Sequence, residues 1–166
     1  MMNEELNKIS QYERALATMS PEASESTYWK VCREFEDDLL DFSGFPDSYF
    51  EFVLKLFSDA AFYAKKGAWH FLLALGTEQH RLQERHYKGM ADVFVANFDK
   101  YLSLDELLPL TVCDFIARNY STSVATKLFD RLEEIERTKP REQQGFVQDG
   151  RRIVEAEAQR ALAAKR

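Results

Sequence analysis

Apolar residues recur at helical spacing along most of this sequence, and that periodicity restricts the possible fold more than any other feature of the chain. One segment illustrates it with the residues Tyr28, Val31, Cys32, Phe35, Leu39 and Phe42, which follow the spacing of one face of an α-helix. The composition agrees, because Leu and Ala together number 35 whereas Val and Ile together number 12. No strand alternation or hairpin turn interrupts the pattern, so the sequence predicts an all-α fold.

Capping residues and helix breakers divide the pattern into about seven helices. We expect them near 3–18, 21–43, 83–101 and 104–119, with one more that Ser121 or Thr122 opens and that continues through Ile135, and two between 48 and 76 that meet near Gly67. Ser20 is the expected N-cap of the second helix, and Gly44 is its expected left-handed C-terminal residue. Ser48 begins a Ser-x-x-Glu capping box. Pro109 either kinks the 104–119 helix or marks the point where a helix restarts.

The pattern also predicts the domain organisation. We expect one helical domain in residues 1–138, a compact bundle of antiparallel helices, followed by a polar linker and a C-terminal helix in residues 139–166. A HEAT-like series of helical hairpin repeats is the alternative, because segments 69–73 and 112–116 share an apolar pattern 43 residues apart. The last segment is Ala-rich and weakly amphipathic, so we expect it to dock loosely or to fray.

Charge and cysteine content exclude several classes of protein. The chain carries 22 basic and 28 acidic residues, a formal net charge of -6, which argues against nucleic-acid binding through a generally basic surface. The first residues lack the basic and apolar stretches of a signal peptide, so we expect a cytoplasmic protein without a membrane partner. Cys32 and Cys113 both fall on apolar helical faces and are expected to be buried rather than reactive.

Motifs for metal, phosphate or nucleophilic chemistry are absent from the sequence. It has no Gly-rich phosphate loop, no Gly-x-Ser-x-Gly elbow and no paired-cysteine motif. His80 and Glu84 have the spacing of one helix face, with His86 close by, but no second cluster supplies the remaining ligands of a zinc site. We therefore expect neither a metal nor a cofactor.

The placement of negative charge is the most informative functional feature. Residues 1–60 hold five Lys and Arg against 13 Asp and Glu, which accounts for the whole negative excess. Within them Glu34, Asp37, Asp38 and Asp41 form a stripe opposite the apolar face of their helix. Carboxylates near a helix C-terminus are opposed by the helix dipole, so stability alone does not favour them there. The acidic stripe is therefore either a binding surface or a solvated polar face.

Together with segments 69–75 and 113–120, the acidic stripe resembles the small, acidic, all-helical immunity proteins with which bacteria neutralise their own toxins. This resemblance implies a non-enzymatic protein that occludes a basic surface of a cognate toxin. Trp29 and Tyr49, at the edges of the acidic helix, would then anchor the contact.

Two other functions are compatible with the sequence. One is a helical adaptor or regulatory protein with a different basic partner. The other is an RNA-cleaving enzyme, because Arg81 and His86 resemble the Arg-x(4-6)-His motif of HEPN-class helical ribonucleases. Leu82 stands where that family usually has a polar residue, and the motif lies mid-chain instead of near the C-terminus.

Overall fold

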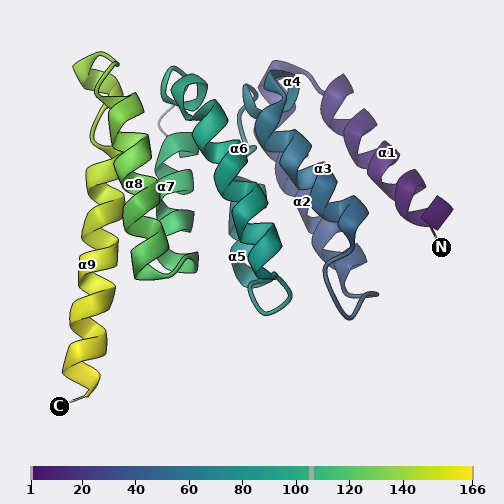
Figure 1. Cartoon of the computed structure of the whole chain (residues 1–166). Helices are drawn as coiled ribbons and strands as arrows, with labels where there is room; N and C mark the ends of the chain where they lie inside the picture. The colour runs from purple at the N-terminus through teal and green to yellow at the C-terminus, as the bar shows by residue number, and fades with distance from the viewer. Residues whose placement is uncertain (1, 105–106, 166) are drawn as a thin grey trace. The chain divides into compact units, whose positions relative to one another are not determined.

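Helices make up the regular secondary structure of residues 2–104 and 107–165, the residues described by the computed structural model (Figure 1). The structure is 80% helical and has no strand among these residues, which confirms the predicted all-α class. The α-helices are α1 (Met2–Thr18), α2 (Ser24–Leu39), α3 (Asp47–Ser58), α4 (Ala60–Tyr63), α5 (His70–Thr77), α6 (Glu84–Leu102), α7 (Leu107–Asn119), α8 (Thr122–Glu136) and α9 (Phe146–Ala164). Two short 3-10 helices precede α2 and α9, η1 (Pro21–Ala23) and η2 (Arg141–Gln143).

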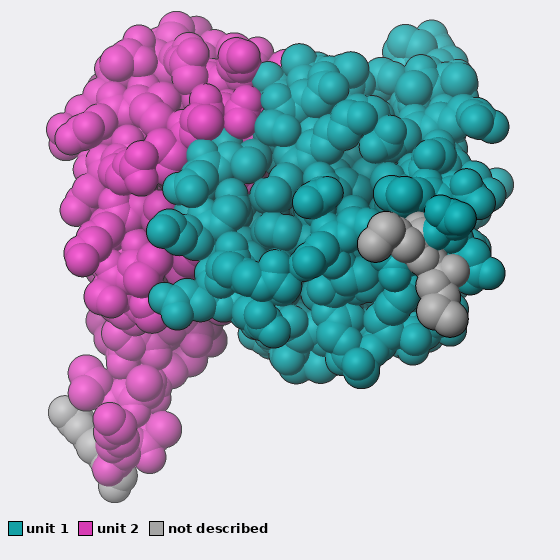
Figure 2. All heavy atoms as spheres, turned by 45° about the vertical axis from the view of Figure 1, so that its right-hand side comes forward, with its two compact units in different colours: residues 1–93 teal, residues 94–166 magenta. Residues whose placement is uncertain are grey.

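The chain divides into two compact units, residues 1–93 and residues 94–166 (Figure 2). The division falls inside α6, between Val93 and Phe94. The boundary expected from the sequence, after residue 138, lies within the second unit, where α9 packs against α7 and α8.

Aromatic rings fill the core of the first unit, in which α2 packs against α1 and α5 and α1 packs against α3. The ring of Phe35 lies at the centre, with centroid distances of 5.4 Å to Tyr49, 5.4 Å to Phe71 and 6.0 Å to Tyr12. Each of these rings is almost completely buried. Such tilted and edge-on ring pairs add stability beyond that gained from burying the rings.

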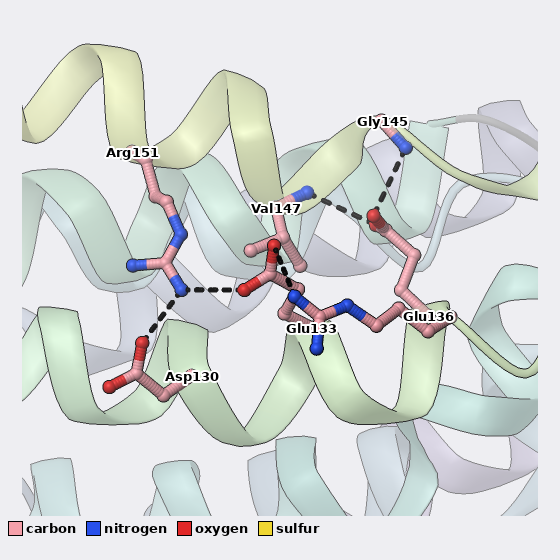
Figure 3. A network of polar contacts seen from close by, with 7 residues as sticks. Asp130, Glu133, Glu136, Gly145, Val147 and Arg151 are labelled. Atoms are coloured by element: carbon pink, nitrogen blue, oxygen red, sulfur yellow. Dashed lines mark hydrogen bonds and ion pairs between the residues drawn. The ribbon is translucent and has the colours of Figure 1, made fainter.

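In the second unit, a carboxylate from the end of α8 caps the start of α9 (Figure 3). The two oxygens of Glu136 accept hydrogen bonds from the backbone N–H groups of Gly145 and Val147, each at 3.1 Å. The first amides of a helix have no partner within the helix, and a negative group there also complements its dipole. Arg151, one turn further along α9, donates to Asp130 at 2.8 Å and to Glu133 at 3.1 Å on α8.

The hydrogen bonds between α8 and α9 lie in the first half of α9, and beyond them Glu157 lies 3.8 Å from Arg118 of α7. Gly150 lies directly against α7 and α8, since a Cβ atom at this position would come within 2.6 Å of the Phe129 ring. Residues 157–165 are exposed. The C-terminal segment therefore docks through its first turns, while its remaining turns extend past the ends of the neighbouring helices (Figure 1).

The helix ends depart from the sequence predictions around α2 and α3. The Ser20 hydroxyl accepts from the N–H of Ala23 at 3.3 Å, but it caps η1, and α2 begins later. At its other end α2 stops at Leu39, earlier than expected. Gly44 does not adopt the left-handed conformation, since among the described residues the glycines with positive φ are Gly67 and Gly145. Ser48 forms no capping box, because Pro46 is the N-cap of α3 and Ser48 lies inside the first turn, where its hydroxyl donates to Glu5 of α1 at 2.7 Å.

Residues 48–76 form parts of three helices rather than two. The carboxylate of Asp59 accepts from the N–H of Ala61 at 2.9 Å and starts α4 as a separate turn. Gly67 has φ of 107°, and a Cβ there would lie 2.9 Å from the backbone of Glu25, so glycine is required both for the turn and for the close approach to α2. Pro109 lies in the first turn of α7, where proline is tolerated. Residues 105 and 106, in the expected 104–119 helix, lie outside the described residues.

Candidate functional site

Part of the acidic stripe lines a groove on the first unit. The groove has a volume of about 310 Å³ and is formed by the first turns of α1, the end of α2 with the turn that follows it, and the start of α3. Its lining residues are Glu4, Glu5, Lys8, Asp38, Asp41, Phe42 and Tyr49. We call this the acidic groove, because it brings together four carboxylates and one ammonium group.

Asp38 links two of the helices that form the acidic groove. Its carboxylate accepts a hydrogen bond from the Tyr12 hydroxyl and another from Lys8 Nζ at 3.3 Å. Burial, together with the contact to Asp38, raises the pKa of Tyr12, so the phenol keeps its proton. The hydrogen bond to Asp38 raises the pKa of Lys8. Asp38 therefore joins α1 to α2 and is already occupied by partners within the protein.

The carboxylates at the rim are arranged differently. Glu4 and Asp41 are exposed, and neither forms an ion pair with any cation among the described residues. Glu5 accepts from Ser48, as described above. The rim of the groove can therefore accept hydrogen bonds from a cation that the protein does not supply, and the half-buried Phe42 adds an apolar side chain to the lining.

The acidic stripe itself is divided by the fold. Asp38 and Asp41 face the acidic groove, whereas Glu34 and Asp37 are exposed on α2 and do not line it. The sequence analysis missed Glu4, Glu5 and Lys8, which belong to another helix. Two acidic residues in the first turn of a helix are ordinary dipole partners, so only the three-dimensional contact gives them further meaning.

The two predicted aromatic anchors differ in exposure. Trp29 is 53% exposed on α2, with the guanidinium of Arg33 5.5 Å from its ring centroid. Tyr49 is only 2% exposed, because its ring packs against Tyr12 and Phe35 in the core. The expected role of Tyr49 as a surface anchor does not fit this burial, and Tyr49 only borders the acidic groove.

Arg81 supplies the positive charge that the end of α2 lacks in the sequence. Its Nη1 donates to the carbonyl oxygen of Leu39 at 2.5 Å, and its Nε lies 3.1 Å from a carboxylate oxygen of Glu78. A cation at a helix C-terminus offsets the helix dipole. The acidic end of α2 is thus partly compensated by a residue 42 positions further along the chain.

His86, the other residue of the ribonuclease-like motif, is 1% exposed. Its Nδ1 accepts from the backbone N–H of Gln83 at 2.9 Å, and its Nε2 has no hydrogen-bond partner among the described residues. The ring packs against Phe50 at 4.5 Å, and this burial lowers its pKa. A base at this position does not reach solvent, and Arg81 is engaged with α2, so the pair forms no open site for a phosphate.

Both cysteines are buried, as predicted. Burial raises the pKa of Cys32 to about 12 and raises that of Cys113 as well, so neither thiol provides a thiolate nucleophile near neutral pH. Within residues 2–104 and 107–165, no group of three or more His, Cys, Asp or Glu is placed to hold a metal ion. In the same part of the chain, no helix combines the length and apolar character required to cross a bilayer.

Comparison with known proteins gives no further guide to the site, because no protein-family model, curated protein or solved structure matches the chain.

Proposed function

We propose that this chain is a non-enzymatic binding protein whose acidic groove receives a basic side chain of a partner protein, and that it acts as an immunity protein against a bacterial toxin. The observation that carries the proposal is the acidic groove itself, which brings four carboxylates and a single lysine together with the half-buried Phe42. The proposal gives a specific chemical role to Asp38 and Asp41, the two residues of the acidic stripe that line the groove.

The lining of the groove suits a long cationic side chain in particular. The aliphatic stem of an arginine or lysine would lie against the half-buried Phe42, while its charged end would reach the exposed carboxylates of Glu4 and Asp41. Arginine fits better than lysine, because its planar guanidinium bonds two carboxylate oxygens at once.

The groove is also held in place before any partner arrives. Asp38 bonds both Tyr12 and Lys8, Glu5 bonds Ser48, and the Tyr12 and Tyr49 rings belong to the buried core. A site held in its bound shape loses less conformational entropy on binding. Inhibition would follow from occlusion, because a protein of this size on a basic active-site surface excludes the toxin's substrate.

An enzymatic function receives no support from the residues that first suggested it. Arg81 bonds the end of α2 and Glu78, and His86 is enclosed by aromatic rings. We therefore expect the purified protein not to cleave structured or single-stranded RNA. RNA cleavage that is lost in Arg81→Ala, while that variant retains its fold, would favour the ribonuclease alternative.

The binding role can be tested with a fluorescein-labelled hexa-arginine peptide and fluorescence anisotropy. We expect the variant Glu4→Gln with Asp41→Asn to bind the peptide about fivefold to thirtyfold more weakly, since two exposed ion pairs contribute roughly 0.5 to 1 kcal/mol each. The matched control is Glu142→Gln with Glu155→Gln, which removes the same charge from exposed positions of the second unit. If both variants lose the same affinity for the peptide, the loss is due to net charge alone, and the groove proposal is overturned.

The immunity role needs a cellular test. An immunity gene is expected to lie directly after a large toxin gene, so the adjacent upstream gene is expressed with and without this chain and growth is recorded. Protection by the wild-type chain and by the control variant, but not by the groove variant, is the expected result. Absence of protection by the wild-type chain would contradict an immunity role for this pair of genes.

A further inference from the structure

A second surface of the first unit, separate from the acidic groove, surrounds Trp29. Leu73 of α5, which is 50% exposed, and Trp29 of α2 both line one hollow, and α2 packs against α5. Single exposed apolar residues are common on proteins. Here, however, the indole borders two hollows at once, and tryptophan is enriched among the residues that contribute most to binding at protein interfaces.

The first hollow, which we call the carboxylate hollow, has a volume of about 500 Å³ and is lined by Glu22, Glu25, Ser26, Trp29 and His70. Its lining includes two carboxylates and no Lys or Arg. Burial lowers the pKa of His70, so this histidine is neutral near pH 7 and adds no positive charge. The carboxylate hollow is therefore negative, with an aromatic face on one side.

The second hollow, which we call the leucine hollow, has a volume of about 190 Å³. Trp29, Leu73 and Ala74 give it an apolar surface, and Arg33 and Glu36 supply the charged part of its lining. Trp29 and His70 line both hollows, so the two are adjacent. The surface is also ordered, because Arg33 lies over the Trp29 ring and His70 stacks on Trp69 at 3.9 Å.

We propose that the carboxylate hollow and the leucine hollow together bind one basic and apolar segment of a partner polypeptide. A lysine or arginine of the segment would lie against Trp29 on the side of the carboxylate hollow, whose lining includes Glu22 and Glu25 but not Arg33, and an apolar side chain a few residues away would lie beside Leu73. Charge complementarity decides the occupant of the first hollow, since an acidic segment would meet two carboxylates there. This inference does not depend on the acidic groove.

The test uses the full-length protein labelled with ¹⁵N and a series of short peptides with one arginine and one leucine separated by zero to three alanines. We expect at least one spacing to shift the indole N–H signal of Trp29 and the backbone amides of His70 and Leu73. In Trp29→Ala the affinity should fall by about tenfold or more, as for a truncated aromatic anchor. Glu34→Gln with Asp37→Asn, exposed residues of α2 that line neither hollow, is the charge control and should leave the affinity unchanged.

The same series separates the proposal from its alternatives without relying on protein variants. Replacing the peptide arginine by citrulline, which is neutral, and replacing the leucine by alanine should each weaken binding. Equal binding of the citrulline peptide would overturn the basic component, and equal binding of the alanine peptide would overturn the apolar component. Absence of any shift at Trp29 with all peptides at millimolar concentration would overturn the proposal as a whole.

Discussion

At the scale of single residues, neighbouring carboxylates of the acidic stripe have different roles. Asp38 is partly buried and bonds Tyr12 and Lys8, whereas Asp37 is exposed. Asp38 is therefore a structural residue as well as part of the acidic groove. A charge change at Asp38 alters both binding and stability, so binding experiments are better directed at Glu4 and Asp41.

This difference leads to a prediction about stability. We expect Asp38→Ala to lower the free energy of unfolding by about 1 to 3 kcal/mol, because it leaves the partly buried Tyr12 hydroxyl without its acceptor. Asp37→Ala should change it by less than about 0.5 kcal/mol, as is usual for an exposed residue. Urea denaturation of both variants provides the comparison, and equal effects would mean that the Tyr12 contact contributes nothing.

His86 makes stability depend on pH. Its pKa in the folded protein is lowered, first by burial and then by Arg85, whereas in the unfolded chain it is near the ordinary value of about 6.5. Below that pH the unfolded chain takes up the proton before the folded protein does, so the free energy of unfolding should fall as the pH decreases from about 6.5 toward the folded pKa. Above pH 6.5 His86 makes no pH-dependent contribution.

The variant His86→Asn isolates this effect, since asparagine does not titrate and retains an acceptor near the N–H of Gln83. We expect its free energy of unfolding to fall less between pH 7 and pH 5.5 than that of the wild-type protein. His70, whose pKa is also lowered by burial, remains in both proteins and contributes equally to both curves. Parallel curves would show that His86 is not the group responsible.

At the scale of the elements, α9 depends on a cap supplied by α8. Glu136 satisfies two backbone amides at the start of α9. We expect Glu136→Ala to lower the free energy of unfolding by about 1 to 3 kcal/mol, because the amide of Val147 is then left buried without a partner. Hydrogen exchange should also become faster in the first turns of α9.

Glu134→Ala is the matched control, since it removes a carboxylate from an exposed position of the same helix. We expect it to change the free energy of unfolding by less than about 0.5 kcal/mol. If both variants behave alike, the hydrogen bonds of Glu136 have no net effect on stability.

The sequence could predict those parts of the fold that depend on the pattern within one helix, but not those that depend on contacts with other segments. The helices α1, α6 and α8 lie close to their predicted positions, because an apolar stripe is a property of the helix itself. The ends near Leu39 and Gly145 were not predictable, because their backbone groups are bonded by Arg81 and Glu136, which lie in other helices or turns of the chain.

The candidate site could likewise be predicted only for residues that lie in one segment of the chain. Asp38 and Asp41 were predicted, because they lie on one helix and its following turn, whereas Glu4, Glu5 and Lys8 reach the groove only through the packing of α1 on α2. Tyr49 was misassigned for a related reason. The sequence does not show whether an aromatic residue at the start of a helix is exposed. In the structure, contacts with Tyr12 and Phe35 bury Tyr49.

At the scale of the whole molecule, the formal charge is divided unequally between the two units. Residues 1–93 hold ten Lys and Arg against 16 Asp and Glu, whereas residues 94–166 hold twelve of each. The whole net charge of -6 therefore belongs to the unit that carries the acidic groove. Such a field accelerates the approach of a basic partner and makes the association rate sensitive to salt.

The most direct test of the central claim is a double-mutant cycle between Asp41 and the hexa-arginine peptide. Asp41→Asn in the protein is combined with the replacement of each peptide arginine in turn by citrulline, and the dissociation constant of every pair is measured. For at least one arginine we expect the two losses of affinity not to add, because each change removes the same contact, whereas in the parallel cycle with Asp37→Asn the losses should add. Additive losses at Asp41 for every arginine would contradict the claim that the acidic groove binds a basic side chain.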